Sequence, residues 1–220
     1  MANQLSRWHV GALLALTITA IPACGLGDAD PNAIRAPFTV TDYFAPSGFM
    51  GDGSATDHTP KPVDMARGED CATRPPNARG VCYRFAYTPL SHLDGGVGWG
   101  GVYWQNPANN WGQDPPQKVT PNAERVAFYA AGQQGGEAVT FLVGGLHATD
   151  PNGAPLPYAD TLSMQKKIVL TNAMTRYEIP ITDNSYTGVI GGFGFSISAV
   201  NGQGGTIYLD DIVWLAPGDE

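Results

Sequence analysis

The chain has 220 residues, and 20 Asp and Glu against 12 Lys and Arg give it a formal net charge of −8 at pH 7. Without a basic patch to neutralise phosphates, nucleic-acid binding is disfavoured. The 28 glycines, the 18 prolines and a charged fraction of only 15 % favour an exported all-β domain with many turns.

Residues 1–23 are predicted to be an export signal. Arg7 precedes the apolar run 10–21, which is too short to remain as a membrane-spanning helix but has the length of a secretory signal core. The sequence Ile21-Pro22-Ala23-Cys24 resembles a bacterial lipobox, whose cysteine is acylated. We therefore expect a cell-envelope lipoprotein held at the membrane by lipid on Cys24, with residues 24–36 as a tether. An ordinary signal peptide is the alternative and would give a secreted protein.

The segments that follow predict strands separated by turns, without a convincing helix. In chain order they lie at 38–44, 82–88, 101–105, 125–130, 138–143, 165–170, 175–181, 194–199 and 206–215. Strands at this spacing without intervening helices predict an antiparallel two-sheet β-sandwich over residues 37–217. We expect this single domain to be a monomer.

Two cysteines remain if Cys24 is acylated, and we expect Cys71 and Cys82 to form a disulfide in an oxidising compartment. The short segment between them is rich in proline and glycine and has no core of its own. Closing it stabilises the fold by about 2–3 kcal/mol in the chain-entropy model.

The stretch 98–112 holds three tryptophans, one tyrosine, three asparagines and one glutamine. Aromatic rings beside side-chain amides suit sugars, which offer an apolar C–H face and a rim of hydroxyls. The alternative is that the tryptophans belong to the core and are followed by a turn.

Period-two alternation assigns side chains to the two faces of each strand. Within 82–88 it turns Arg84 outward, opposite Tyr83 and Phe85; within 101–105 it turns Tyr103 and Gln105 outward, opposite Trp104. If these strands are neighbours of 125–130 in one sheet, their outward residues form one ligand-binding surface flanked by two loop tryptophans. The candidate ligand-binding residues are Arg84, Trp99, Tyr103, Gln105, Trp111 and Tyr129.

The segment 205–214 (GTIYLDDIVW) resembles the last strand of galactose-binding-like jelly rolls, among them carbohydrate-binding modules of families 4, 11 and 22. The segments 38–44 and 49–53 resemble the opening strand and loop of the same modules. The resemblance implies a jelly-roll sandwich that binds a polysaccharide or oligosaccharide, usually on a concave sheet. It also implies a structural calcium near the first and last strands.

Calcium requires several oxygen ligands, and the acids available on these segments are Asp42, Asp52, Asp57 and the pair Asp210-Asp211. Adjacent aspartates on a strand point to opposite sides, so one of the pair would bind the ion, and Asp211 is favoured. The predicted ligands are Asp42, Asp52 and Asp211. The alternative for Asp52 and Asp57 is that they only solvate a loop.

Enzymatic activity is not expected. A glycosidase needs two carboxylates across the scissile bond, and the outward Glu178 has no second acid patterned beside it. No Gly-x-Ser-x-Gly elbow, His-Glu-x-x-His motif or phosphate loop occurs in the sequence. The alternatives to non-catalytic glycan binding are a structural or adhesive envelope protein, or a polysaccharide hydrolase or lyase.

Overall fold

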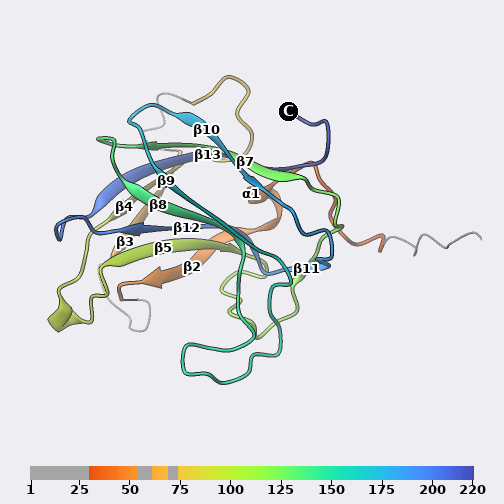
Figure 1. Ribbon diagram of the computed structural model, residues 1–220, viewed down its shortest axis with the longest axis horizontal. Coiled ribbons are helices and arrows are strands. Elements are labelled where there is room, and N and C mark those ends of the chain that lie inside the picture. Colours follow the sequence, from red (N-terminus) through yellow and green to blue (C-terminus); the bar gives the residue numbers. More distant parts are fainter. Residues whose placement is uncertain (1–29, 54–60, 69–73) are drawn as a thin grey trace, which may run out of the picture.

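Two antiparallel sheets packed face to face form the domain, so the predicted sandwich is confirmed (Figure 1). The computed structural model describes residues 30–53, 61–68 and 74–220. The predicted signal, Cys24 and Cys71 lie outside these ranges. Within them, no helix has the length and apolar character needed to cross a membrane.

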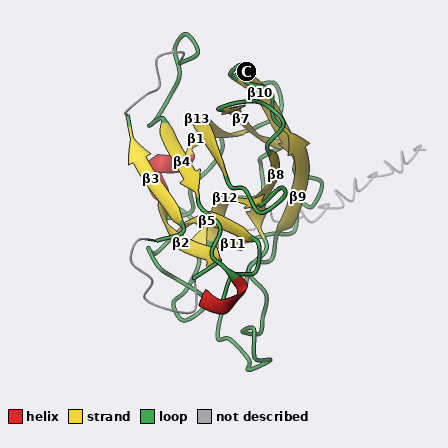
Figure 2. Cartoon of the chain, turned by 90° about the vertical axis from the view of Figure 1, so that its left-hand side faces the viewer, coloured by secondary structure: helices red, strands yellow, loops and turns green. Residues whose placement is uncertain are grey.

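The first sheet has the strand order β10-β7-β13-β4-β3, and β1 pairs with β13 at its side; the second has the order β2-β5-β12-β8-β9 (Figure 2). Two short strands, β6 and β11, pair with each other. The strands are β1 (Phe38–Thr39), β2 (Ala45–Gly51), β3 (Val63–Arg67), β4 (Tyr83–Tyr87), β5 (Trp99–Gln105), β6 (Gln117–Lys118), β7 (Arg125–Gly132), β8 (Ala138–Gly144), β9 (Ser163–Val169), β10 (Thr175–Pro180), β11 (Gly188–Val189), β12 (Gly191–Ser198) and β13 (Gly205–Leu215).

The predicted strand 38–44 is wrong beyond Thr39. A single helical turn, α1 (Val40–Tyr43), follows β1, and the chain then enters the other sheet as β2. Val40 and Phe44 are both buried, and their spacing of four residues places them on one side of a helical turn. Burial of these two side chains therefore explains why the strand breaks here.

Aromatic side chains from both sheets fill the space between them. Phe85 of β4 packs against Trp104 of β5 and Phe195 of β12, with ring centroids 5.6 and 4.8 Å apart. Phe128 of β7 lies 4.5 Å from Phe141 of β8. All five residues belong to strand positions that alternation places inward, and their rings join the two sheets.

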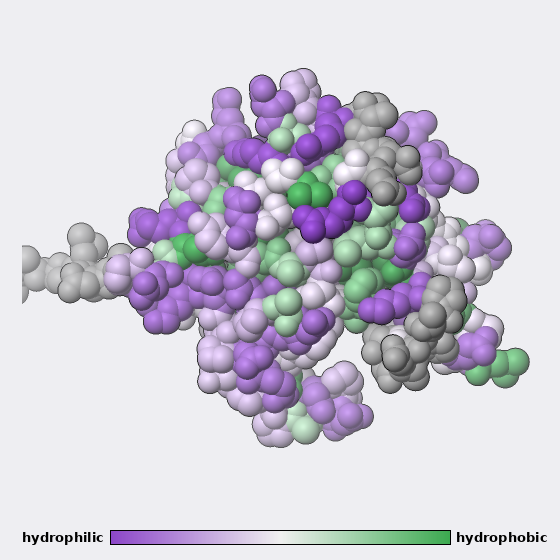
Figure 3. All heavy atoms as spheres, turned by 180° about the vertical axis from the view of Figure 1, so that it is seen from behind, coloured by the Kyte–Doolittle hydropathy of each residue, from purple (hydrophilic) through white to green (hydrophobic). Residues whose placement is uncertain are grey.

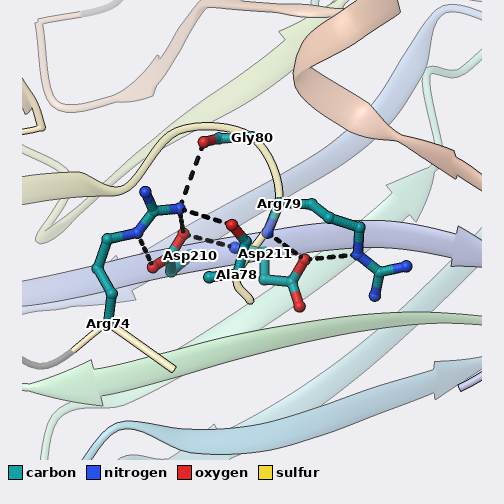
Figure 4. A network of polar contacts seen from close by, with 6 residues as sticks. All are labelled: Arg74, Ala78, Arg79, Gly80, Asp210 and Asp211. Carbon is teal, nitrogen blue, oxygen red and sulfur yellow. Dashed lines mark hydrogen bonds and ion pairs between the residues drawn. The ribbon is translucent and has the colours of Figure 1, made fainter. Parts of the chain in front are cut away.

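The segment 74–80 is held against β13 by two ion pairs (Figure 4). The side chain of Asp210 is fully buried and accepts two hydrogen bonds from Arg74, at 2.7 and 2.8 Å. Asp211, at a bulge in β13 with φ of 48°, accepts from the backbone N–H and the Nε of Arg79, both at 2.9 Å. The predicted disulfide would close the same segment at the buried Cys82, and this pairing stays a prediction because Cys71 is not described.

Replacing Arg74 by alanine should destabilise the fold by about 1–3 kcal/mol, because it leaves the buried Asp210 carboxylate without its charged donor. The loss should be below that of a fully buried pair, since 39 % of the Arg74 side chain is exposed and water can reach the gap. Urea unfolding measures the difference.

Arg79→Ala is the matched control, because Asp211 would keep its bond from the backbone N–H of residue 79. We expect a loss below about 1 kcal/mol for this more exposed pair. Equal losses in the two variants would contradict the role given to Arg74.

Candidate functional site

The six predicted ligand-binding residues do not lie on one sheet: two belong to the first sheet, three to β5 of the second, and Trp111 to the loop after β5. Arg84 on β4 and Tyr129 on β7 belong to the first sheet, where β13 separates their strands, whereas Tyr103 and Gln105 lie on β5 of the second. The expectation of one shared surface is therefore wrong. Alternation predicts the face of a strand but not the sheet that the strand joins. Arg84 forms an ion pair with Asp64 at 3.1 Å.

The outer face of the second sheet is ordered in rows that cross its strands. The register places Met50, Gly101, Ser196, Thr140 and Lys167 directly opposite one another on β2, β5, β12, β8 and β9, and we call these five residues the central row. Adjacent strands lie about 4.8 Å apart, so the central row extends for roughly 19 Å. Its three middle positions carry only a glycine and two hydroxyl side chains.

Two tryptophans lie on either side of the central row. Trp99 precedes Gly101 by two positions on β5 and shares its face, and 37 % of the residue is exposed. Trp111, 38 % exposed, lies in the loop after β5 and stacks on Tyr103, with ring centroids 6.3 Å apart and an angle of 21°. Tyr103 follows Gly101 by two positions. The central row therefore runs between two partly exposed indole rings.

Tyr103 is itself only 4 % exposed, so it supports Trp111 instead of offering its own ring to a ligand. Its ring lies across β12, because a Cβ added at Gly191 or Gly194 would come within 2.2 or 2.4 Å of a ring atom. Its hydroxyl donates to the carbonyl of Gly144 and lies 3.4 Å from Asp160. Burial, and then the nearby Asp160, raise the pKa of Tyr103 well above its ordinary value, so the hydroxyl stays a donor.

Asp160 connects the long loop after β8 to β12. Its carboxylate accepts hydrogen bonds from the backbone N–H groups of Leu146, Ile190 and Gly191. Burial raises the pKa of Asp160 above its ordinary value, against the opposing effect of these bonds. The loops after β5 and β8 descend from the same end of the sheet and are joined by the Tyr158 N–H to Gly112 carbonyl bond of 3.1 Å (Figure 1).

The amides of the 98–112 stretch shape the loop that carries Trp111. Gln105 is 1 % exposed; its Nε2 donates to the Asn110 carbonyl at 2.8 Å, and its Oε1 accepts from Ser47 at 3.3 Å. The Oδ1 of Asn110 accepts from the backbone N–H groups of Gly112, Gln113 and Asp114. Gln105 therefore holds this loop and does not contact a ligand, because both of its amide atoms are already bonded.

Asp52 fixes the loop that precedes Trp99. Its buried carboxylate accepts from the Tyr87 hydroxyl at 2.7 Å and from the backbone N–H groups of Leu90, Val97 and Gly98. Burial alone would raise the pKa of this carboxyl, but the four hydrogen bonds outweigh it and hold the pKa below its ordinary value of 3.8. Asp52 is thus a structural carboxylate.

The three predicted calcium ligands do not form a cation site together. The oxygens of Asp52 face four donors, Asp211 is bonded to Arg79, and Asp42 is exposed on α1. A cation at Asp52 or Asp211 would face the positive ends of these donors. Across residues 30–53, 61–68 and 74–220, no group of three or more His, Cys, Asp and Glu could hold a metal ion. Calcium binding stays a prediction without a ligand set among these residues.

No family model and no curated protein matches the sequence. Solved structures similar to this chain include the family 11 carbohydrate-binding module of the cellulosomal cellulase Lic26A-Cel5E of Clostridium thermocellum, at 10 % identity and a TM-score of 0.43, covering 86 % of this chain and 99 % of that one. A family 30 carbohydrate-binding module has 13 % identity and a TM-score of 0.48, covering 80 % and 85 %. A family 11 module from Clostridium thermocellum in complex with a β-1,3-1,4-mixed-linked tetrasaccharide has 12 % identity and a TM-score of 0.40, covering 70 % and 82 %. All three scores are below 0.5, so the site is assigned from this chain's own residues.

Acidification should remove the contribution of Asp52 to stability. A carboxyl whose folded pKa is lowered stabilises the fold above its ordinary pKa of 3.8 and loses that effect as pH falls through the lower folded value. Urea unfolding midpoints from about pH 6 to about pH 2.5 should therefore show Asp52→Asn well below wild type at neutral pH, with the gap narrowing in acid.

Asp114→Asn is the control, because it removes the same charge at an exposed position of another loop. Its midpoint should stay close to wild type throughout this range. A gap between Asp52→Asn and wild type that does not change with pH would contradict the role given to the Asp52 carboxylate.

Tyr103→Phe should destabilise the protein by about 1–2 kcal/mol, because the Gly144 carbonyl loses its buried donor while the stacking on Trp111 remains. Thermal or urea unfolding measures this loss. Tyr43→Phe, at a tyrosine that is 44 % exposed, should change stability by less than about 0.5 kcal/mol. Equal effects of the two substitutions would show that the Tyr103 hydroxyl holds nothing in place.

Proposed function

We propose that the outer face of the β2-β5-β12-β8-β9 sheet binds a polysaccharide or oligosaccharide along the central row. The observation that carries the proposal is the pair of partly exposed rings, Trp99 and Trp111, on either side of the hydroxyls of Ser196 and Thr140. Indole rings suit the apolar face of a sugar, and side-chain hydroxyls both donate and accept hydrogen bonds with its rim. The carbohydrate-binding modules similar in structure are consistent with this proposal.

The face is suited to binding without cleavage. Hydrolysis of a glycosidic bond requires two carboxyl groups across the bond, and the five residues of the central row include none. Burial raises the pKa of Asp160, but its oxygens are bonded to backbone N–H groups and to the Tyr103 hydroxyl, so it supports the loop. A glycan held on this face would therefore dissociate unchanged.

Export and acylation of Cys24 belong to the same proposal and are supported by the sequence of residues 1–24. They would place the face outside the cell, where polysaccharides are available. The side seen in Figure 3 is mainly hydrophilic, with hydrophobic surface in small separate areas. Binding measurements can use a form that begins within the tether and so lacks the predicted signal and Cys24.

Affinity electrophoresis in gels that contain neutral glucans, xylans or mannans, or acidic polysaccharides, tests the proposal. Trp99→Ala and Trp111→Ala should each weaken retardation roughly two- to twelvefold, the range for an aromatic contact worth about 0.5–1.5 kcal/mol. No reducing ends should be released during incubation with the glycan.

Tyr129→Ala is the control, because Tyr129 lies on the other sheet and should leave retardation unchanged. Lack of retardation by every neutral and acidic glycan, or an equal effect of Tyr129→Ala and the tryptophan variants, would refute the assignment of this face.

A further inference from the structure

Charge is distributed unequally between the two sheets. No residue of β2, β5, β8, β9 or β12 is acidic, although the whole chain has 20 Asp and Glu. The first sheet carries Asp64, Glu178, Asp210 and Asp211 on its strands. In a protein with a net charge of −8, strands without carboxylates repel an anion less than strands that carry them.

One cation lies at the end of the central row. Lys167 of β9 is directly opposite Thr140 of β8, so its side chain shares the outer face with Thr140 and Ser196. The residue is exposed, and its ammonium has no hydrogen bond or ion pair to any other residue that the structure describes. Its amide neighbour on the same face, Gln165, adds a further donor two positions along the strand.

Resting on the proposed function, we propose that the glycan bound by this face is acidic and that Lys167 binds its anionic groups. An ammonium on strands without competing carboxylates attracts a carboxylate or a sulfate ester, whereas a neutral sugar gains little from it. The rings of Trp99 and Trp111 hold the sugar faces, and Lys167 selects chains that carry charge at the β9 end of the row.

The adjacent Lys166 offers a matched control within the same strand. Its ammonium donates to the carbonyl of Glu178 on β10 at 2.9 Å, and its register partner is the core residue Phe141, so it points away from the outer face. An edge strand also carries lysines simply to prevent pairing with other chains. Lys166→Gln and Lys167→Gln remove the same charge from the same edge, so only a ligand contact distinguishes them.

The experiment compares polysaccharide pairs that share a backbone and differ in charge. One pair is polygalacturonate and its carboxyl-reduced form, and the other is carrageenan and its desulfated form. Affinity electrophoresis or calorimetry at low ionic strength should show stronger binding of the acidic member in at least one pair. Lys167→Gln should weaken that binding roughly twofold to fivefold, Lys166→Gln should not, and added salt should remove the preference.

Each outcome has one meaning. A preference in the first pair identifies carboxylates, and one in the second identifies sulfate esters. Equal binding within both pairs, or a preference that Lys167→Gln leaves intact, overturns the inference while binding of neutral glycans keeps the proposed function. Absence of binding to every charged and neutral glycan overturns the proposed function itself. Urea midpoints close to wild type for both lysine variants exclude misfolding as the cause.

Discussion

The outer face of the second sheet depends on the position of the Tyr103 ring. Glycines at 191 and 194 allow the ring to lie across β12, since any Cβ there would come within 2.4 Å of its atoms. From that position the hydroxyl reaches Gly144 at the end of β8, and the ring supports Trp111 in the loop after β5. One tyrosine therefore connects both loops to the strands, and side chains larger than glycine beneath it would separate them.

Buried carboxylates hold the other loops in a similar way. Asp52, Asp160 and Asp210 lie next to different loops, and each is bonded to several N–H or O–H donors. An unpaired charge in such positions would be costly, so the loop must adopt a conformation that turns its donors inward. This requirement explains why Asp52 and Asp210, which the sequence offers as metal ligands, instead accept hydrogen bonds from neighbouring loops.

Local patterns predict the faces of single strands well and their arrangement poorly. Alternation correctly places Trp104 in the core and Tyr103 on the opposite face, because the side-chain period of a strand is two regardless of context. Alternation also places Ser196, Thr140 and Lys167 outward, but the alignment of the whole central row requires the register of four strand pairs. The burial of Gln105 depends on a loop folding back over it, and the separation of Arg84 from Tyr103 depends on the sheet that each strand joins. Both are non-local, so a pattern along the chain does not contain them.

The two outer faces differ in what a ligand would have to displace. On the first sheet, Arg84 is paired with Asp64 and Arg125 with Glu178, and Arg74 of the segment held against β13 is paired with Asp210. A sugar or an anion binding at these three arginines would have to compete with carboxylates of the protein for the guanidinium groups, and would gain little net energy. On the second sheet the polar groups of the central row are hydroxyls and an ammonium, on strands that carry no acids. Because no described residue forms a hydrogen bond or ion pair with these groups, the second face is the one on which hydrogen bonds to a glycan contribute to affinity.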